Sequence, residues 1–138
     1  MKAARMIIFI GCLFGMAAAA DMSAKEKAAV SAAEKWLNLV DQGKYSESWE
    51  QSALLFQSAV TPEQWEQAMN SGRRPLGNLL SRKVTSAHYA TELPGAPDGE
   101  YVVIRFETSF VNKKSAVETV TPMMNPDSTW RVSGYYIK

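Results

Sequence analysis

The chain has 138 residues, 46% of them hydrophobic and 21% charged, and its formal net charge at pH 7 is +1. This length and composition indicate one folded domain, and they exclude both a disordered chain and the basic footprint of a nucleic-acid-binding protein. One histidine and one cysteine are too few for a zinc site of the usual composition, and no metal or other cofactor is predicted.

The first twenty residues have the pattern of a signal peptide. Lys2 and Arg5 give a positive start, and the apolar run that follows, residues 6–16, is too short to cross a bilayer. Four alanines then precede Asp21 and supply the small residues that signal peptidase requires, so cleavage is predicted after Ala20. The mature protein is therefore expected in the periplasm or outside the cell.

A lipoprotein signal is the alternative interpretation, because Phe9–Cys12 loosely resembles the segment that precedes a lipid-modified cysteine. Its apolar stretch would be unusually short, and the alanine run would have no role. Cleavage after Ala20 leaves one domain, residues 21–138, in which Lys and Arg fall from 15 to 13 against 14 Asp and Glu. That domain has no cysteine for a disulfide or thiol chemistry, and no membrane span is predicted in it.

Helical patterns fill the first half of the mature chain. A helix is predicted over residues 24–42, and four apolar side chains share one of its faces: Val30, Ala33, Leu37 and Val40. Gly43 follows it as a C-cap residue. A second helix is predicted over residues 46–58, with Trp49, Ala53 and Phe56 on one side.

A third helix is predicted to begin at Thr61, where the residue types form a capping box. Thr61 is the N-cap, Pro62 occupies the first helical position, and Gln64 completes the box. The pattern ends near Gly72.

Four strands are predicted in the second half, over residues 82–93, 100–111, 115–124 and 129–137. In the second strand five residues alternate onto one apolar face: Val102, Ile104, Phe106, Thr108 and Phe110. Pro122 indicates that the third strand is at an edge there, or bulged. Short connections predict an antiparallel meander, and the fold class is α+β, with three helices covering one face of the sheet.

Five short sequence motifs occur along the chain in an order that resembles a known family. They are Trp36-Leu37-x-Leu39-Val40-Asp41-x-Gly43-x-Tyr45-x-x-Ser48-Trp49, Arg74-Pro75-Leu76-Gly77 with Ser81-Arg82, Leu93 to Tyr101, Glu118-Thr119-Val120, and Trp130-Arg131-Val132-x-Gly134-Tyr135-Tyr136. With them the mature chain resembles the bacterial domain of unknown function 4019 family, which implies export and a compact domain but no catalytic residues. The element order also resembles the cone-shaped nuclear-transport-factor-2-like fold, which hosts both enzymes and inert binders.

His88 is the candidate general base, because histidine titrates near neutral pH. In a cone-fold enzyme it would act beside a strand carboxylate, for which Glu107 and Glu118 are the candidates. The alternative is that all three are ordinary polar residues of a sheet face. No nucleophile elbow, phosphate-binding glycine loop or dinucleotide fingerprint occurs in the sequence.

A basic cluster is the candidate ligand-binding site. Arg73, Arg74 and Arg82 would hold a carboxylate or an acidic partner, and Tyr45 would stand near them at the mouth of a cone. The alternative is that the arginines neutralise the end of the third helix and stack on an aromatic ring.

Three functions follow from these patterns. We favour a non-enzymatic exported module that binds an unknown small ligand or protein. The alternatives are an enzyme using His88 with a strand carboxylate, and a structural protein that forms a homodimer through the sheet face carrying Tyr101 and Val103.

The exported protein is expected to begin at Asp21, because the alanines before it are the best cleavage signal ahead of the first helix. The intact mass of the protein recovered from outside the cytoplasm measures this. A lipid-modified Cys12 or a retained Met1 would contradict it.

Overall fold

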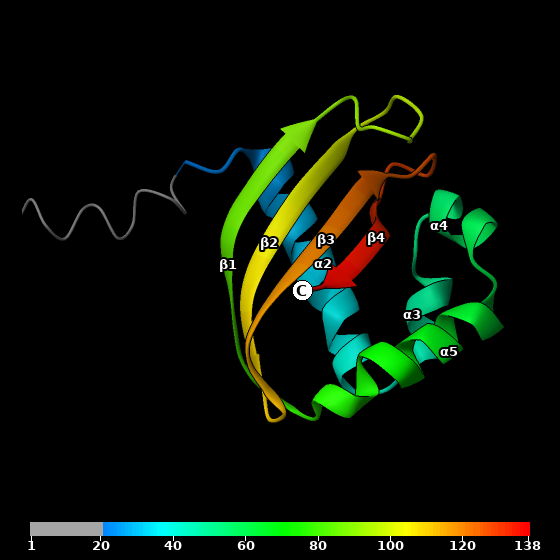
Figure 1. Cartoon of the computed structure of the whole chain (residues 1–138). Helices are drawn as coiled ribbons and strands as arrows, with labels where there is room; N and C mark the ends of the chain where they lie inside the picture. Colours follow the sequence, from blue (N-terminus) through cyan, green and yellow to red (C-terminus); the bar gives the residue numbers. More distant parts are fainter. Residues whose placement is uncertain (1–20) are drawn as a thin grey trace, which may run out of the picture.

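The computed structural model describes residues 21–138, and the predicted signal peptide lies outside the described residues. The elements in chain order are α2 (Ala24–Asp41), α3 (Tyr45–Glu50), α4 (Leu54–Ala59), α5 (Pro62–Gly72), a 3-10 turn η1 (Arg74–Leu76), β1 (Leu79–Ala90), β2 (Tyr101–Phe110), β3 (Lys113–Met124) and β4 (Trp130–Ile137). The strands curve around α2, and the helices lie on one face of the sheet (Figure 1). Within residues 21–138, no helix has the length and apolar character needed to span a membrane.

Helix α2 is the long helix that the sheet wraps. Its start is fixed by a capping box in which the Glu26 backbone N–H donates to Ser23 Oγ over 3.1 Å and the Ser23 N–H donates to Glu26 Oε1 over 2.9 Å. Gly43 ends the helical segment with a positive φ of 76°. The four predicted core residues of this helix are buried, which confirms the predicted face: Val30, Ala33, Leu37 and Val40.

The second predicted helix is two short helices, α3 and α4, because tertiary hydrogen bonds interrupt it. At the break, the Ala53 N–H donates to the Val132 carbonyl of β4 over 2.8 Å, and the Leu54 N–H donates to Asn125 Oδ1 over 3.1 Å. A continuous helix would keep both N–H groups for its own carbonyls. Local residue spacing therefore predicted the helical content correctly but not the break.

The third predicted helix is confirmed as α5. The Gln64 N–H donates to Thr61 Oγ1 over 3.1 Å, and the Thr61 N–H donates to Gln64 Oε1 over 3.0 Å. Trp65 and Met69 on this helix are buried in the core.

The four strands pair in the order β1-β2-β3-β4, all antiparallel, which confirms the predicted meander. Strand β1 begins and ends three residues earlier than predicted. On β2 the predicted inward face is buried, namely Val102, Ile104, Phe106, Thr108 and Phe110. Helix α2 contacts all four strands, so this inward face and the apolar side of α2 form the core.

Pro122 marks a bulge in an interior strand. Strand β3 pairs with β2 on one side and β4 on the other, and the β3–β4 register shifts between Thr121 and Pro122. The bulge interpretation of this proline is correct and the edge interpretation is wrong, because a register shift lets the ladder accommodate a residue without an N–H.

Replacing Phe106 with alanine is expected to lower the free energy of unfolding by about 3–5 kcal/mol, because this side chain is 1% exposed and its loss leaves a cavity. The matched control, Arg105→Ala, removes an exposed side chain from the next position of β2 and should cost less than about 0.5 kcal/mol. Urea denaturation measures both. Equal losses would contradict the packing of this strand.

Candidate functional site

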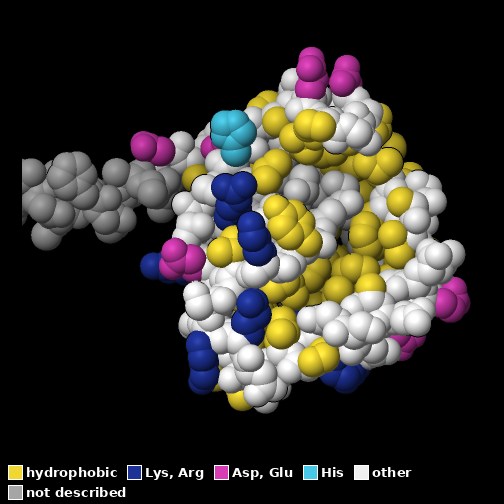
Figure 2. All heavy atoms as spheres, in the orientation of Figure 1, with side chains coloured by type: hydrophobic (Ala, Val, Ile, Leu, Met, Phe, Trp, Pro, Cys, Tyr) yellow, Lys and Arg dark blue, Asp and Glu magenta, His cyan; other side chains and the backbone are white. Residues whose placement is uncertain are grey.

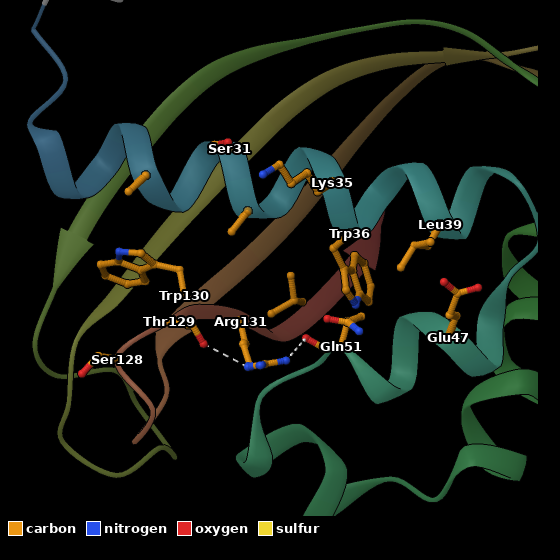
Figure 3. Close-up of a pocket in the computed structure, with 13 residues that line it drawn as sticks. Ser31, Lys35, Trp36, Leu39, Glu47, Gln51, Ser128, Thr129, Trp130 and Arg131 are labelled. Atoms are coloured by element: carbon orange, nitrogen blue, oxygen red, sulfur yellow. Dashed lines mark hydrogen bonds between the residues drawn. The ribbon is translucent and has the colours of Figure 1, made fainter.

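A groove of about 650 Å³ opens between α2, α3 and the start of β4, and we call it the α2–β4 groove. Its lining is Ala28, Ser31, Ala32, Lys35, Trp36, Leu39, Glu47, Gln51 and residues 128–132. In Figure 3, Trp36 and Trp130 stand apart along the groove, with α2 running above both. The groove is thus built by three elements that are distant in the sequence.

The apolar surfaces of the groove depend on two features. Ala28 and Ala32 are one helical turn apart on α2, and their small side chains leave space above β4. The Trp36 ring is fixed, because its Nε1–H donates to the Ser48 carbonyl over 2.9 Å and to Ser52 Oγ over 3.0 Å. The groove therefore has a rigid aromatic wall.

Polar groups surround these apolar surfaces. Lys35 is exposed and forms no ion pair within residues 21–138, whereas Arg131 is bound to Asp127 over 3.1 Å and to the Gln51 carbonyl over 3.4 Å. Glu47 is an exposed carboxylate at the α3 side. Apolar walls with a few convergent polar groups are typical of ligand-binding sites.

A second group of polar residues is the buried charge cluster, which consists of Asp41, Arg73, Arg82, Glu118 and Tyr135. Arg82 donates to both carboxylates, to Asp41 over 2.7 and 3.0 Å and to Glu118 over 2.7 and 3.2 Å. Arg73 donates to Asp41 over 3.2 Å. Two arginines and two carboxylates cancel in charge, as buried ions require.

Glu118 is 0% exposed and has further donors. Thr108 Oγ1 donates to it over 2.6 Å, and the Tyr135 hydroxyl donates to it as well. Burial and the nearby Glu118 carboxylate raise the pKa of Tyr135 above its usual range, so this hydroxyl stays protonated as a donor. Both carboxylates of the cluster are thus bound by its arginines, while the Arg73 Nε is buried without a hydrogen-bond partner among the described residues. Such a buried network holds the fold together.

The structure brings Arg73 and Arg82 of the predicted basic cluster together, but the anions that they bind are the protein's own carboxylates, Asp41 and Glu118. Arg73 is 3% exposed and also donates to the Gly77 carbonyl over 2.7 Å. Arg74 donates to Asn70 and stacks on the buried ring of Tyr45 at 5.1 Å. Binding of an external anion by these arginines stays a prediction. The guanidinium groups of Arg73 and Arg82 already donate to Asp41, and the one Arg73 nitrogen without a partner among the described residues, Nε, is buried.

His88 does not meet either candidate carboxylate. His88 is exposed and pairs with Val103 of β2. Glu107 lies four residues further along β2 and pairs with Lys83. At the rise of a strand, four residues separate His88 from Glu107 by ~13 Å. Glu118 pairs with Phe106 and so points to the inward face. Within residues 21–138, no three His, Cys, Asp or Glu side chains are grouped to hold a metal ion.

The sequence patterns did not predict the groove. The available signal was a second stripe on α2, with Ala28, Ala32, Lys35 and Leu39 at helical spacing beside the core stripe. That stripe indicates a groove only when β4 is known to lie next to it.

The sequence profile of the DUF4019 family, described as proteins of unknown function, matches residues 32–135. The chain belongs to this family. The match covers α2 from its middle onward, the other helices and all of the sheet except the last residues of β4, so the groove and the buried charge cluster lie almost wholly within it. Comparisons with curated proteins and with solved structures gave no significant match.

Replacing Glu118 with alanine is expected to lower the free energy of unfolding by about 3–5 kcal/mol, because Arg82 would be left without half of its buried counter-charge. Glu107→Ala is the matched control on the same sheet. Its carboxylate is exposed and 3.7 Å from Lys83, so its loss should change stability by about 0.5 kcal/mol or less. Similar losses in chemical denaturation would show that the buried cluster is not a structural tie.

Proposed function

We propose that this DUF4019 protein is a non-enzymatic binding module that holds its ligand in the α2–β4 groove. The observation that carries the proposal is the groove itself, in which the partly exposed side chains of Ala32, Leu39 and Trp130 offer apolar surface. Beside them is the ammonium group of Lys35, which forms no ion pair within residues 21–138. A ligand that fits the groove has an apolar body and an anionic group at the Lys35 rim. Such a ligand is bound by contact and charge, without a proton-transfer step.

The alternative of catalysis has less support, because a general base must lie within hydrogen-bond reach of its partners. His88 lies on the face of the sheet opposite the helices, and Glu26, the carboxylate with which it interacts electrostatically, already accepts from the Ser23 and Tyr89 N–H groups. The carboxylates with most contacts, Asp41 and Glu118, are occupied by arginines. A base removed from a catalytic site should cost about a hundredfold or more in rate, whereas we expect His88→Ala to be silent.

We further propose that the protein works outside the cytoplasm, which rests on the signal-peptide pattern of residues 1–20. The domain needs no disulfide for this location, since its core contains a packed aromatic group: Trp36, Phe56, Trp65 and Tyr135.

Filling the groove tests the proposal. In Ala32→Trp, the new indole occupies the space between α2 and β4, and we expect loss of whatever small molecule or peptide copurifies with the unaltered protein. Native mass spectrometry followed by identification of the released compound measures this loss.

Ala68→Trp is the matched control, because it adds the same side chain at an exposed position of α5 outside the groove lining. This control should retain the ligand. If Ala32→Trp retained the ligand and had a normal unfolding midpoint, the groove would not be the binding site. A His88→Ala variant that is folded but inactive in the cell would favour the alternative that the protein is an enzyme.

A further inference from the structure

The face of the sheet turned away from α2, which we call the outer face, differs in charge from the rest of the domain. Pairing places Lys83, Arg105 and Glu107 on it, and Lys138 joins them beside Val117. Lys113 and Lys114 follow at the β2–β3 turn. Lys and Arg side chains run down this face in Figure 2.

Charge is therefore segregated in the domain. The outer face and its β2–β3 turn carry five basic residues against one acidic residue, Glu107, a formal side-chain charge of +4. The other residues of 21–138 carry eight basic against 13 acidic side chains, which is −5. A domain with almost no net charge thus has one strongly positive side, and this asymmetry orients it toward an anionic surface.

Apolar side chains project at the same end of the sheet. Leu80 is 52% exposed and Val111 is 43% exposed, and they are neighbours in space because Leu79 pairs with Phe110 and the Val111 N–H donates to the Asn78 carbonyl. Exposed leucine and valine at a turn beside lysines form an amphipathic edge.

A hollow of about 580 Å³ lies between this edge and the middle of the outer face. Hydroxyl groups and lysines line it, namely Ser81, Lys83, Ser109, Lys114 and Ser115 among others. Lysine ammonium and serine hydroxyl groups donate hydrogen bonds and suit a phosphate group. Glu107 also borders the hollow, 3.7 Å from the Lys83 ammonium.

We propose that this end of the outer face docks on the surface of a bilayer that contains anionic phospholipids. Lipid phosphates occupy the serine and lysine hollow, and Leu80 and Val111 enter the interface beside it. Basic residues next to exposed apolar side chains match a lipid surface, which offers negative charge and an apolar layer together. The acidic remainder of the domain is repelled, so one orientation is favoured.

The orientation leaves the α2–β4 groove accessible, because α2 lies on the other face of the sheet. Docking is therefore independent of the ligand proposed for the groove, and either proposal can fail without the other.

Vesicle cosedimentation of the protein tests the docking. We expect binding to vesicles of phosphatidylglycerol and phosphatidylcholine in equal amounts, weakening as salt is raised, and no binding to phosphatidylcholine alone. Lys83→Glu with Lys114→Glu should lower partitioning by at least about thirtyfold, since each basic side chain near an anionic surface raises it about fivefold. Leu80→Ser with Val111→Ser should lower it by about tenfold.

Matched variants separate this end of the sheet from general charge and hydrophobicity. The charge control is Lys27→Glu with Lys44→Glu, which alters two exposed lysines of the helical side. The hydrophobicity control is Leu54→Ser, which alters an exposed leucine of α4. Both control variants should bind the vesicles as the unaltered protein does. Equal loss in these controls, equal binding to neutral vesicles, or no cosedimentation would overturn the proposal. So would sedimentation velocity showing a dimer that the Lys83 and Lys114 changes dissociate, because the outer face would then bind a second copy.

Discussion

The position of Arg82 between Asp41 and Glu118 is the constraint on which the rest of the arrangement depends. Its guanidinium connects the C-terminal end of α2 to β1 and β3, and Arg73 adds the segment after α5. An unpaired charge there would have to leave the interior, so these elements must meet in one register. Tyr135 extends the same network to β4.

The buried charge cluster and the α2–β4 groove lie toward opposite ends of β4. The buried charge cluster meets β4 near Tyr135, late in the strand, whereas the α2–β4 groove meets it at residues 128–132, where the strand begins. The buried charge cluster joins Asp41 of α2 to Tyr135 of β4 through Arg82 and Glu118, which fixes the spacing of the two elements, and Ser48 and Ser52 fix the Trp36 ring. A groove with fixed walls binds without the entropy loss of ordering them.

The two faces of the sheet have different chemistry because the side chains of a strand alternate. On β2, Phe106 enters the core while Arg105 and Glu107 face outward. Tyr101 does not supply the apolar patch predicted for a homodimer, because it is buried and its hydroxyl donates to the Pro97 carbonyl over 2.6 Å. Lysines and serines lie at the other end of the outer face, around the hollow that Lys83 and Lys114 border, which supports the proposed docking on an anionic surface.

The sequence by itself determined the α+β class, the order of elements, the capping box at Thr61 and the inward face of β2, since these depend on local spacing and on neighbouring residues. Only the tertiary structure decided the break before Leu54, the pairing of Arg82 with two carboxylates, the burial of Glu118 and the groove between α2 and β4. Each of these joins residues far apart in the chain, and a one-dimensional pattern gives a residue's type and periodicity but not its distant neighbour.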